Sequence, residues 1–176
     1  MKNKTTLLSI GSGGMNILND IKTIDDNFDF LYINKIDNEA IEQGLTPIFE
    51  NIDEEQKIIL DDEIEAKLSE TLKDVQKINI ITTLGGQIST EAPKILKYII
   101  NNLNIDINIY ATTPFDFEEK TVIKRATDTL KKIKQLNSDI SLFDNNILLK
   151  KATSLKMDEL FKTLSKDIYT KIVSKG

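Results

Sequence analysis

The sequence predicts an α/β fold: a three-layer, doubly wound, mostly parallel sheet of Rossmann-like type with strand order 3-2-1-4-5-6. Short apolar, β-prone runs alternate along the chain with longer segments in which apolar residues recur at helical spacing. Glycine-rich turns follow the first and the fourth run, where a sheet of this order reverses its winding. The 176 residues contain no internal repeat, low-complexity tract or linker, so we expect a single domain over 1–176.

Six β-prone runs predict the strands, which lie in chain order at 5–10, 28–33, 47–52, 77–82, 105–111 and 140–143. Helical spacing of apolar residues predicts helices at 17–24, 37–43, 54–75, 92–103, 122–133 and 157–172. Gly44 is expected to end the second of these helices. In the fourth, Thr90 is the expected cap and Pro93 lies in the first turn, where its missing N–H costs little.

Composition excludes several classes of chemistry. The chain has no Cys and no His, which excludes disulfides, zinc–thiolate sites, cysteine nucleophiles and Ser-His-Asp catalysis. A net charge of −5 argues against nucleic-acid binding, which needs a basic face. The apolar runs are too short to cross a bilayer and the start has no long apolar signal region. We therefore expect a cytoplasmic protein that binds neither nucleic acid nor membrane and holds no metal of its own.

Two glycine turns are expected to border one crevice. Residues 10–16 read IGSGGMN and residues 84–90 read LGGQIST, after the first and fourth strands. These strands are neighbours in the predicted order, so both turns would open helices whose N-terminal N–H groups favour an anion. Taken alone, GSGG fits a plain strand-to-helix turn equally well. The dinucleotide fingerprint requires glycine where the chain has Asn16, and the Walker ending is absent.

Several stretches, in order, resemble the N-terminal GTPase domain of the FtsZ/tubulin family. Residues 10–16 look like the family's first phosphate loop, IGVGGGGGNA, and residues 30–41 look like FIAVNTDAQAL. Residues 84–93, LGGQISTEAP, are similar to the signature GGGTGTGAAP, and residues 113–118, TPFDFE, are similar to KPFxFEG. The segment DNNILL at 144–149 resembles PNDKLL, and the last predicted helix resembles the family's central helix. The likeness spans nearly the whole chain.

The resemblance implies a site for GTP or GDP, with Mg²⁺ only when a nucleotide is bound. The glycine backbone and nearby hydroxyls would contact phosphate, Glu118 the ribose, Asn145 the ribose or base, and Phe161 would stack on guanine. The nucleotide-binding residues implied in this way are Gly11, Ser12, Gly13, Gly14, Asn16, Gly85, Gly86, Ser89, Thr90, Glu118, Asn145 and Phe161. Without the resemblance, Glu118 fits a solvated first helical turn, Asn145 a turn and Phe161 the core.

The chain departs from the family pattern in both phosphate loops. The first glycine turn is about two residues shorter, so fewer N–H groups can converge on an anion. Gln87, Ile88 and Glu91 stand where the family has small residues. A carboxylate at Glu91 would repel phosphate unless a cation intervened. The segment 50–63, expected near the γ-phosphate, contains no glycine.

Further departures concern the base and the chemistry. Val122 stands where the family has an arginine, and Ser165 stands where it has the acid that reads guanine. The sequence stops after the last predicted helix, so we expect the family's C-terminal domain and its water-positioning aspartates to be absent. No catalytic residue is assigned.

These features favour a divergent FtsZ-like pseudo-GTPase, connected with cell division, that binds guanine nucleotide weakly or not at all and does not hydrolyse it. It would act through a protein partner, FtsZ or a second copy, by modulating or capping a filament. Two alternatives stay open: a GTPase active only with a partner's catalytic loop, and an unrelated flavodoxin-like or Rossmann-type ligand-binding domain. A strand order of 2-1-3-4-5 would support a flavodoxin-like domain. Tyr169, Ile172 and Val173 either form an exposed apolar patch or pack on the core.

Overall fold

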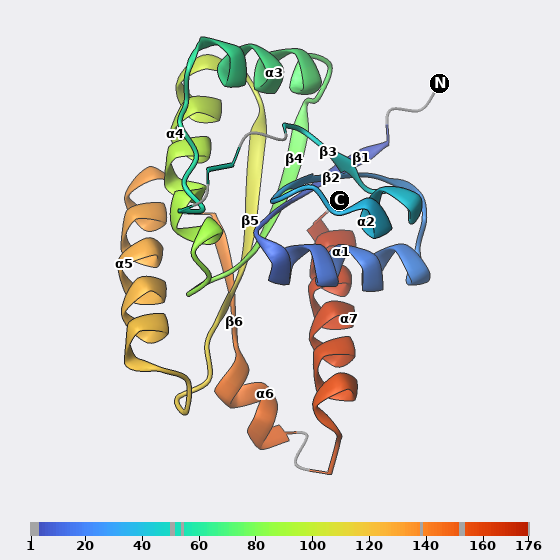
Figure 1. Ribbon diagram of the computed structural model, residues 1–176. Helices are drawn as coiled ribbons and strands as arrows, with labels where there is room; N and C mark the ends of the chain where they lie inside the picture. Colours follow the sequence, from blue (N-terminus) through green and yellow to red (C-terminus); the bar gives the residue numbers. More distant parts are fainter. Residues whose placement is uncertain (1–3, 50–51, 54, 138, 152–153, 176) are drawn as a thin grey trace.

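The computed structural model describes residues 4–175 except 50, 51, 54, 138, 152 and 153. The strands in this part of the chain are β1 (Thr5–Ile10), β2 (Phe28–Ile33), β3 (Thr46–Pro47), β4 (Lys77–Thr83), β5 (Asp106–Thr113) and β6 (Ile140–Asp144). All pair in parallel, in the order β3-β2-β1-β4-β5-β6 (Figure 1). The predicted fold class and strand order are confirmed, and the flavodoxin order is excluded.

Helices cover both faces of the sheet. They are α1 (Ser12–Ile24), α2 (Asn38–Glu42), α3 (Asp62–Leu72), α4 (Ala92–Asn102), α5 (Lys120–Leu136), α6 (Asn145–Lys151) and α7 (Met157–Lys175), with a 3₁₀ turn η1 (Ile88–Glu91) before α4. Successive residues of a strand face opposite layers. In β1, Leu8 packs in the core with α3, α4 and α5, whereas Leu7 packs in the core with α1, α2 and α7. These are the three predicted layers.

The third strand and the helix after it are shorter than predicted. β3 pairs only two residues with β2, and Pro47, which has no N–H to give a ladder, is the second of them. Helix α3 begins only at Asp62, because the Asp61 side chain accepts a hydrogen bond from the Ile64 N–H at 2.9 Å and caps the helix there. Residues 50, 51 and 54 of the two predicted elements lie outside the described residues.

Two local predictions near the ends of elements are wrong. Thr90 does not cap α4, since it lies inside η1 and its hydroxyl donates to the Gln87 carbonyl. Asn145 is not a turn residue, because it opens α6, a helix that the sequence did not predict. Of the two alternatives left open for the last helix, packing on the core holds for Ile172, which is buried, whereas Val173 is 51 % exposed.

The topology brings four connections to one edge of the sheet. Because all strands run in parallel, the turns that follow β1, β4, β5 and β6 leave from their carboxyl ends, beside each other. This edge is where open α/β sheets bind ligands. No helix in the described ranges is both long enough and apolar enough to span a bilayer.

Candidate functional site

The two glycine turns lie against each other at this edge. Gly11, before α1, has φ 93° and Gly85, after β4, has φ 104°. Both values fall in the left-handed region that side chains disfavour. A Cβ added to Gly11 would lie 3.7 Å from the backbone nitrogen of Ser89, so the two turns lie close together, and residues of both line one hollow. The convergence that the sequence predicts is therefore present.

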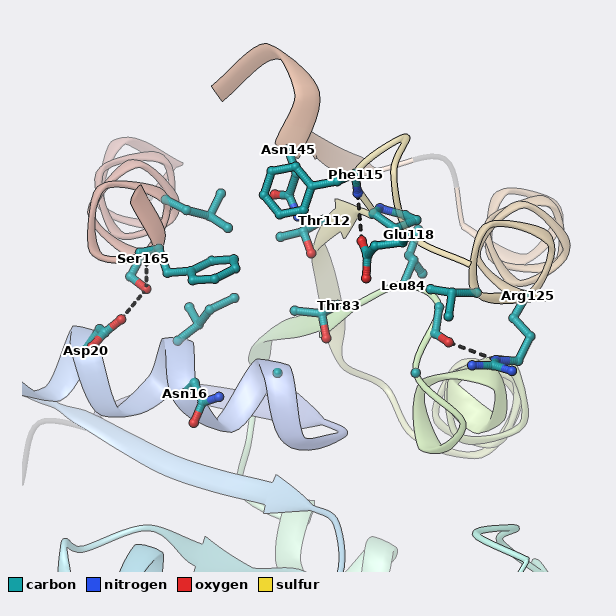
Figure 2. A pocket seen from close by; sticks show the side chains of 18 residues that line it. Asn16, Asp20, Thr83, Leu84, Thr112, Phe115, Glu118, Arg125, Asn145 and Ser165 are labelled. Carbon is teal, nitrogen blue, oxygen red and sulfur yellow. Dashed lines mark hydrogen bonds between the residues drawn. The ribbon is translucent and has the colours of Figure 1, made fainter. Parts of the chain in front are cut away.

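A large hollow of about 450 Å³ opens beside these turns (Figure 2). It lies between α1, α7 and the connections that follow β4, β5 and β6. The residues implied by the resemblance that line it are Gly13, Asn16, Gly85, Gly86, Glu118, Asn145 and Phe161. Hollows of this size accept a ligand as large as a nucleotide.

A polar hollow of about 240 Å³ adjoins the large one and shares Thr83 and Gly86 with it. Its other lining residues are Gly11, Ser12, Asn34, Lys35, Gln56, Gln87, Ile88 and Ser89. Helix α1 begins here, so its unpaired N-terminal N–H groups and the Lys35 ammonium favour an anion. Gln56 comes from the segment that the resemblance assigns to the γ-phosphate, so part of that segment reaches the site.

Gly14 and Thr90 line neither of these two hollows. A Cβ on Gly14 would come within 2.8 Å of the Ile81 carbonyl oxygen. Gly14 therefore lets α1 lie close on the sheet. Of the predicted nucleotide-binding residues, Gly14 therefore serves the packing of α1 on the sheet, and Thr90 lies within the η1 turn.

Thr83, the last residue of β4, stands at the boundary of the two hollows. A Cβ on Gly13 would collide with the Thr83 hydroxyl, and its Cγ2 would lie only 2.7 Å away. The threonine side chain thus fills the space beside Gly13. A ligand that occupied both hollows would have to pass over it.

Glu118 and Asn145 line the large hollow, and each has a side-chain oxygen that can accept a further hydrogen bond. Glu118 lies ahead of α5 rather than in its first turn, and its Oε2 accepts from the Phe115 N–H at 2.7 Å. Figure 2 shows its carboxylate pointing inward. Asn145 is only 7 % exposed, and its Oδ1 is buried without a hydrogen-bond partner. Leaving such an acceptor unpaired costs about 1–3 kcal/mol, so a donor on a ligand would be favoured there.

Phe161 does not belong to the core. It is 42 % exposed and lines the large hollow from α7. Its ring meets Phe115 edge-on, with 6.2 Å between the centroids, and Phe115 stacks on Phe117 at 4.8 Å. Phe115 and Phe161, which both line the hollow, form an aromatic wall that suits a flat ligand group.

Two charged residues in the large hollow were missed by the sequence reasoning. Arg125 lines the end of the hollow near the glycine pair, where its Nε donates to the Gly85 carbonyl at 2.8 Å. It is the single arginine of the sequence and lies three positions after Val122, on the same face of α5. Asp20 lies four positions after Asn16 on α1 and lines the opposite end (Figure 2). In both cases the spacing of three or four positions from a residue that the resemblance matches to the family's site, on the same helix, could have identified the residue from the sequence.

The condition under which Glu91 would not repel phosphate, a neighbouring cation, is met. The Glu91 carboxylate is buried, forms an ion pair with Lys94 at 2.9 Å and lines neither hollow. The cation that neutralises it is therefore built into the first turn of α4. Within the described ranges, no three potential metal-ligating side chains cluster together.

Comparison with known proteins finds similarity to a curated protein and to a set of solved structures. No family model matches the chain. A cell division protein FtsZ from Mycoplasmopsis pulmonis is 28 % identical over 95 residues, which is 54 % of this chain and 24 % of that protein.

The solved structures share the fold at low identity. An FtsZ dimer from M. jannaschii has TM-score 0.72 and 18 % identity over 96 % of this chain and 53 % of that chain. The GTPγS-bound protofilament of CetZ2 from Haloferax volcanii has TM-score 0.73 and 16 % identity over 96 % and 57 %. TubZ of Clostridium botulinum phage c-st has TM-score 0.71 and 20 % identity over 94 % and 58 %. The chain spans little more than half of the length of each of these structures.

Proposed function

Because this chain has the fold of the FtsZ/tubulin GTPase domain, we propose that it binds a guanine nucleotide, GTP or GDP, across the two hollows. The observation that carries the proposal is the Oδ1 of Asn145, a buried acceptor without a donor that lines a hollow of nucleotide size. Its neighbours in the hollow, Glu118 and Phe161, offer a second acceptor and a ring face. Together they suit the hydroxyls of a ribose and a flat base.

The phosphates would occupy the glycine-turn side. The N-terminus of α1 opens into the polar hollow, where Lys35 adds a positive charge. Arg125, held to the second turn by Gly85, supplies a guanidinium at the adjoining end of the large hollow. Guanidinium and backbone N–H groups are the donors that phosphate oxygens prefer. The short first turn and Thr83 at the boundary reduce the fit, so we propose weak binding.

Hydrolysis by the protein alone is not part of the proposal. The chain has no histidine, and the described residues lining the polar hollow include no carboxylate that would orient a water molecule near a terminal phosphate. A GTPase reaction that uses a partner's catalytic loop is the second candidate, since the polar hollow is open to one side through the exposed Ser12 and Lys35.

The test is a titration of the purified chain with fluorescent GDP and GTP, with and without Mg²⁺. Denatured protein is first checked for nucleotide carried through purification. We expect saturable binding with a dissociation constant below about 1 mM. Glu118→Gln should weaken it about tenfold, because it removes a charge-assisted hydrogen bond, whereas Glu119→Gln, next in the chain and outside the hollows, should not. Absence of binding to folded protein would overturn the proposal.

We further propose that the chain acts with a protein partner of the same fold, a second copy or an FtsZ-type filament. The support is that the structural neighbours include a dimer and a protofilament. Co-sedimentation with FtsZ polymer and the sedimentation velocity of the protein alone, each with GTP and GDP, test the two partners. Phosphate release above the sum of that from the polymer alone and that from this chain alone would identify the second candidate function. A monomer that leaves the polymer unchanged would contradict both partners.

A further inference from the structure

We propose that Asp20 on α1 recognises the base and selects guanine over adenine, and that Ser165 on α7 holds its carboxylate in place. The inference rests on the proposed nucleotide binding and names the base that the large hollow takes. Ser165 stands where the resemblance would place the acid that reads guanine. In this proposal Asp20, on the facing helix α1, takes the place of that acid.

The position of Asp20 follows from the helical period of α1. Gly13, Asn16, Ile17 and Asp20 all line the large hollow, at positions i, i+3, i+4 and i+7 of that helix. One face of α1 is therefore one wall of the hollow. Figure 2 shows Asp20 and Arg125 at opposite ends of it, with Thr83 between them. A nucleotide whose phosphates lie toward Arg125 would bring its base toward Asp20.

The carboxylate is held on one side and open on the other. The Ser165 hydroxyl donates to its Oδ2 at 2.7 Å, and Ser165 itself is 1 % exposed. None of the ion pairs found in the described part of the chain involves Asp20, and no hydrogen bond found there uses its Oδ1. The group thus has a fixed orientation, an uncompensated charge and a spare acceptor beside the hollow.

This arrangement matches the edge of guanine. A carboxylate accepts hydrogen bonds only, and guanine presents two neighbouring donors, its N1–H and its N2 amino group. Adenine presents a ring nitrogen lone pair at the corresponding position, which would face a negative charge. Phe161, one turn before Ser165 on α7, brings a ring face to the same end of the hollow. Asn16, one turn before Asp20, supplies an amide N–H₂ suited to the guanine carbonyl.

The test compares GDP, IDP, XDP and ADP on the wild-type chain and on Asp20→Asn. The wild type should prefer GDP to ADP and to IDP, which lacks the N2 amino group, by about tenfold or more. In Asp20→Asn the new amide can donate to the 2-carbonyl of xanthine, so the GDP/XDP preference should reverse. A reversal of preference is an effect that general loss of folding would not produce.

Ser165→Ala tests the positioning role. It should weaken GDP about threefold to tenfold while leaving the order of preference intact, because the acid stays but loses its anchor. Tyr169→Phe is the matched control: the Tyr169 hydroxyl also donates from α7 to an α1 carboxylate, that of Asp25, at 3.0 Å, and neither residue lines the large hollow. It should leave nucleotide affinity unchanged.

The outcomes separate the two proposals. If the wild type binds GDP but Asp20→Asn keeps the same GDP/XDP ratio, or if ADP binds as tightly as GDP, the assignment of Asp20 is overturned while nucleotide binding stands. If the folded wild type binds none of the four nucleotides, the proposed function fails, and the assignment of Asp20 fails with it.

Discussion

The Arg125 side chain bonds to the carbonyl oxygen of Gly85, with 2.8 Å between Nε and O, and so ties α5 to the second glycine turn. The family's arginine position is taken by Val122, against which Gly85 packs so closely that an added Cβ would lie 2.7 Å from its Cγ1. The guanidinium of this chain therefore lies one helical turn later in α5, and its Nε is anchored on the backbone of the second glycine turn.

Replacing Arg125 should lower affinity in proportion to ligand charge. Arg125→Ala is expected to weaken GTP and GDP about tenfold or more, because a charge-assisted contact to phosphate is lost, and to leave guanosine nearly unaffected. Titration at two salt concentrations should show a smaller salt dependence than the wild type. Lys124→Ala, an exposed neighbour on the same helix, is the control. Equal losses for GDP and guanosine would contradict a phosphate role.

Shortening Thr83 should join the two hollows. Thr83→Ala removes the atoms beside Gly13, and we expect affinity for GTP to rise about threefold to tenfold, since less of the binding free energy is spent on displacing the side chain. Thr83→Val keeps the volume and loses only the hydroxyl, so it should not improve binding. The measurement is a titration of both variants with GTP. Equal affinities for Thr83→Ala and Thr83→Val would show that the Thr83 side chain does not hinder GTP binding.

Gly13 and Thr83 should be coupled in stability. Gly13→Ala forces a Cβ into the Thr83 side chain, and overpacking of this kind costs about 1–3 kcal/mol of unfolding free energy. Adding Thr83→Gly to Gly13→Ala should recover part of that loss, giving a negative interaction energy in a double-mutant cycle from urea unfolding. Ser12→Ala, exposed at the start of the same helix, should be nearly neutral. Strictly additive effects would contradict the contact.

The pKa of Asp25 gives a pH dependence of known sign. The Asn27 backbone N–H, and after it the Tyr169 hydroxyl, hold the pKa of this carboxyl below its ordinary value of 3.8. A lowered folded-state pKa adds stability that is present above pH 3.8 and is lost as the pH falls through the folded-state pKa. Asp25→Asn should thus unfold at a lower urea concentration than the wild type at pH 7, and the difference should close as the pH falls through the folded-state pKa. A gap that persists at low pH would assign the effect to packing.

The sheet could be predicted because its central strands are buried on both faces and read as short runs rich in apolar, β-prone residues. The segment from Lys77, in β4, is an example, and its predicted end differs from the observed one by a single residue. Pro47 limits β3 to two residues, which apolar content alone does not reveal. Helix α6 was missed because seven residues give too little periodicity to distinguish a helix from a turn.

The parts of the site that depend on the backbone conformation of a short segment could be predicted from the sequence. The parts that depend on packing between helices far apart in the chain could not. The glycine turns have a sequence signature because Gly11 and Gly85 adopt φ values that other residues avoid. The neutralisation of Glu91 by Lys94 was readable as an i,i+3 pair. That Asp20 stands opposite Ser165 depends on how α1 crosses α7, and no single segment of sequence carries that information.

Asp20 and Ser165 are separated by 145 positions in the chain. During synthesis, the glycine turns and β4 leave the ribosome long before α7. The nascent chain therefore contains the glycine turns early, but one wall of the large hollow is missing until α7 packs against α1. Any ligand held by that hollow would therefore bind only after α7 has been synthesised and has packed against α1.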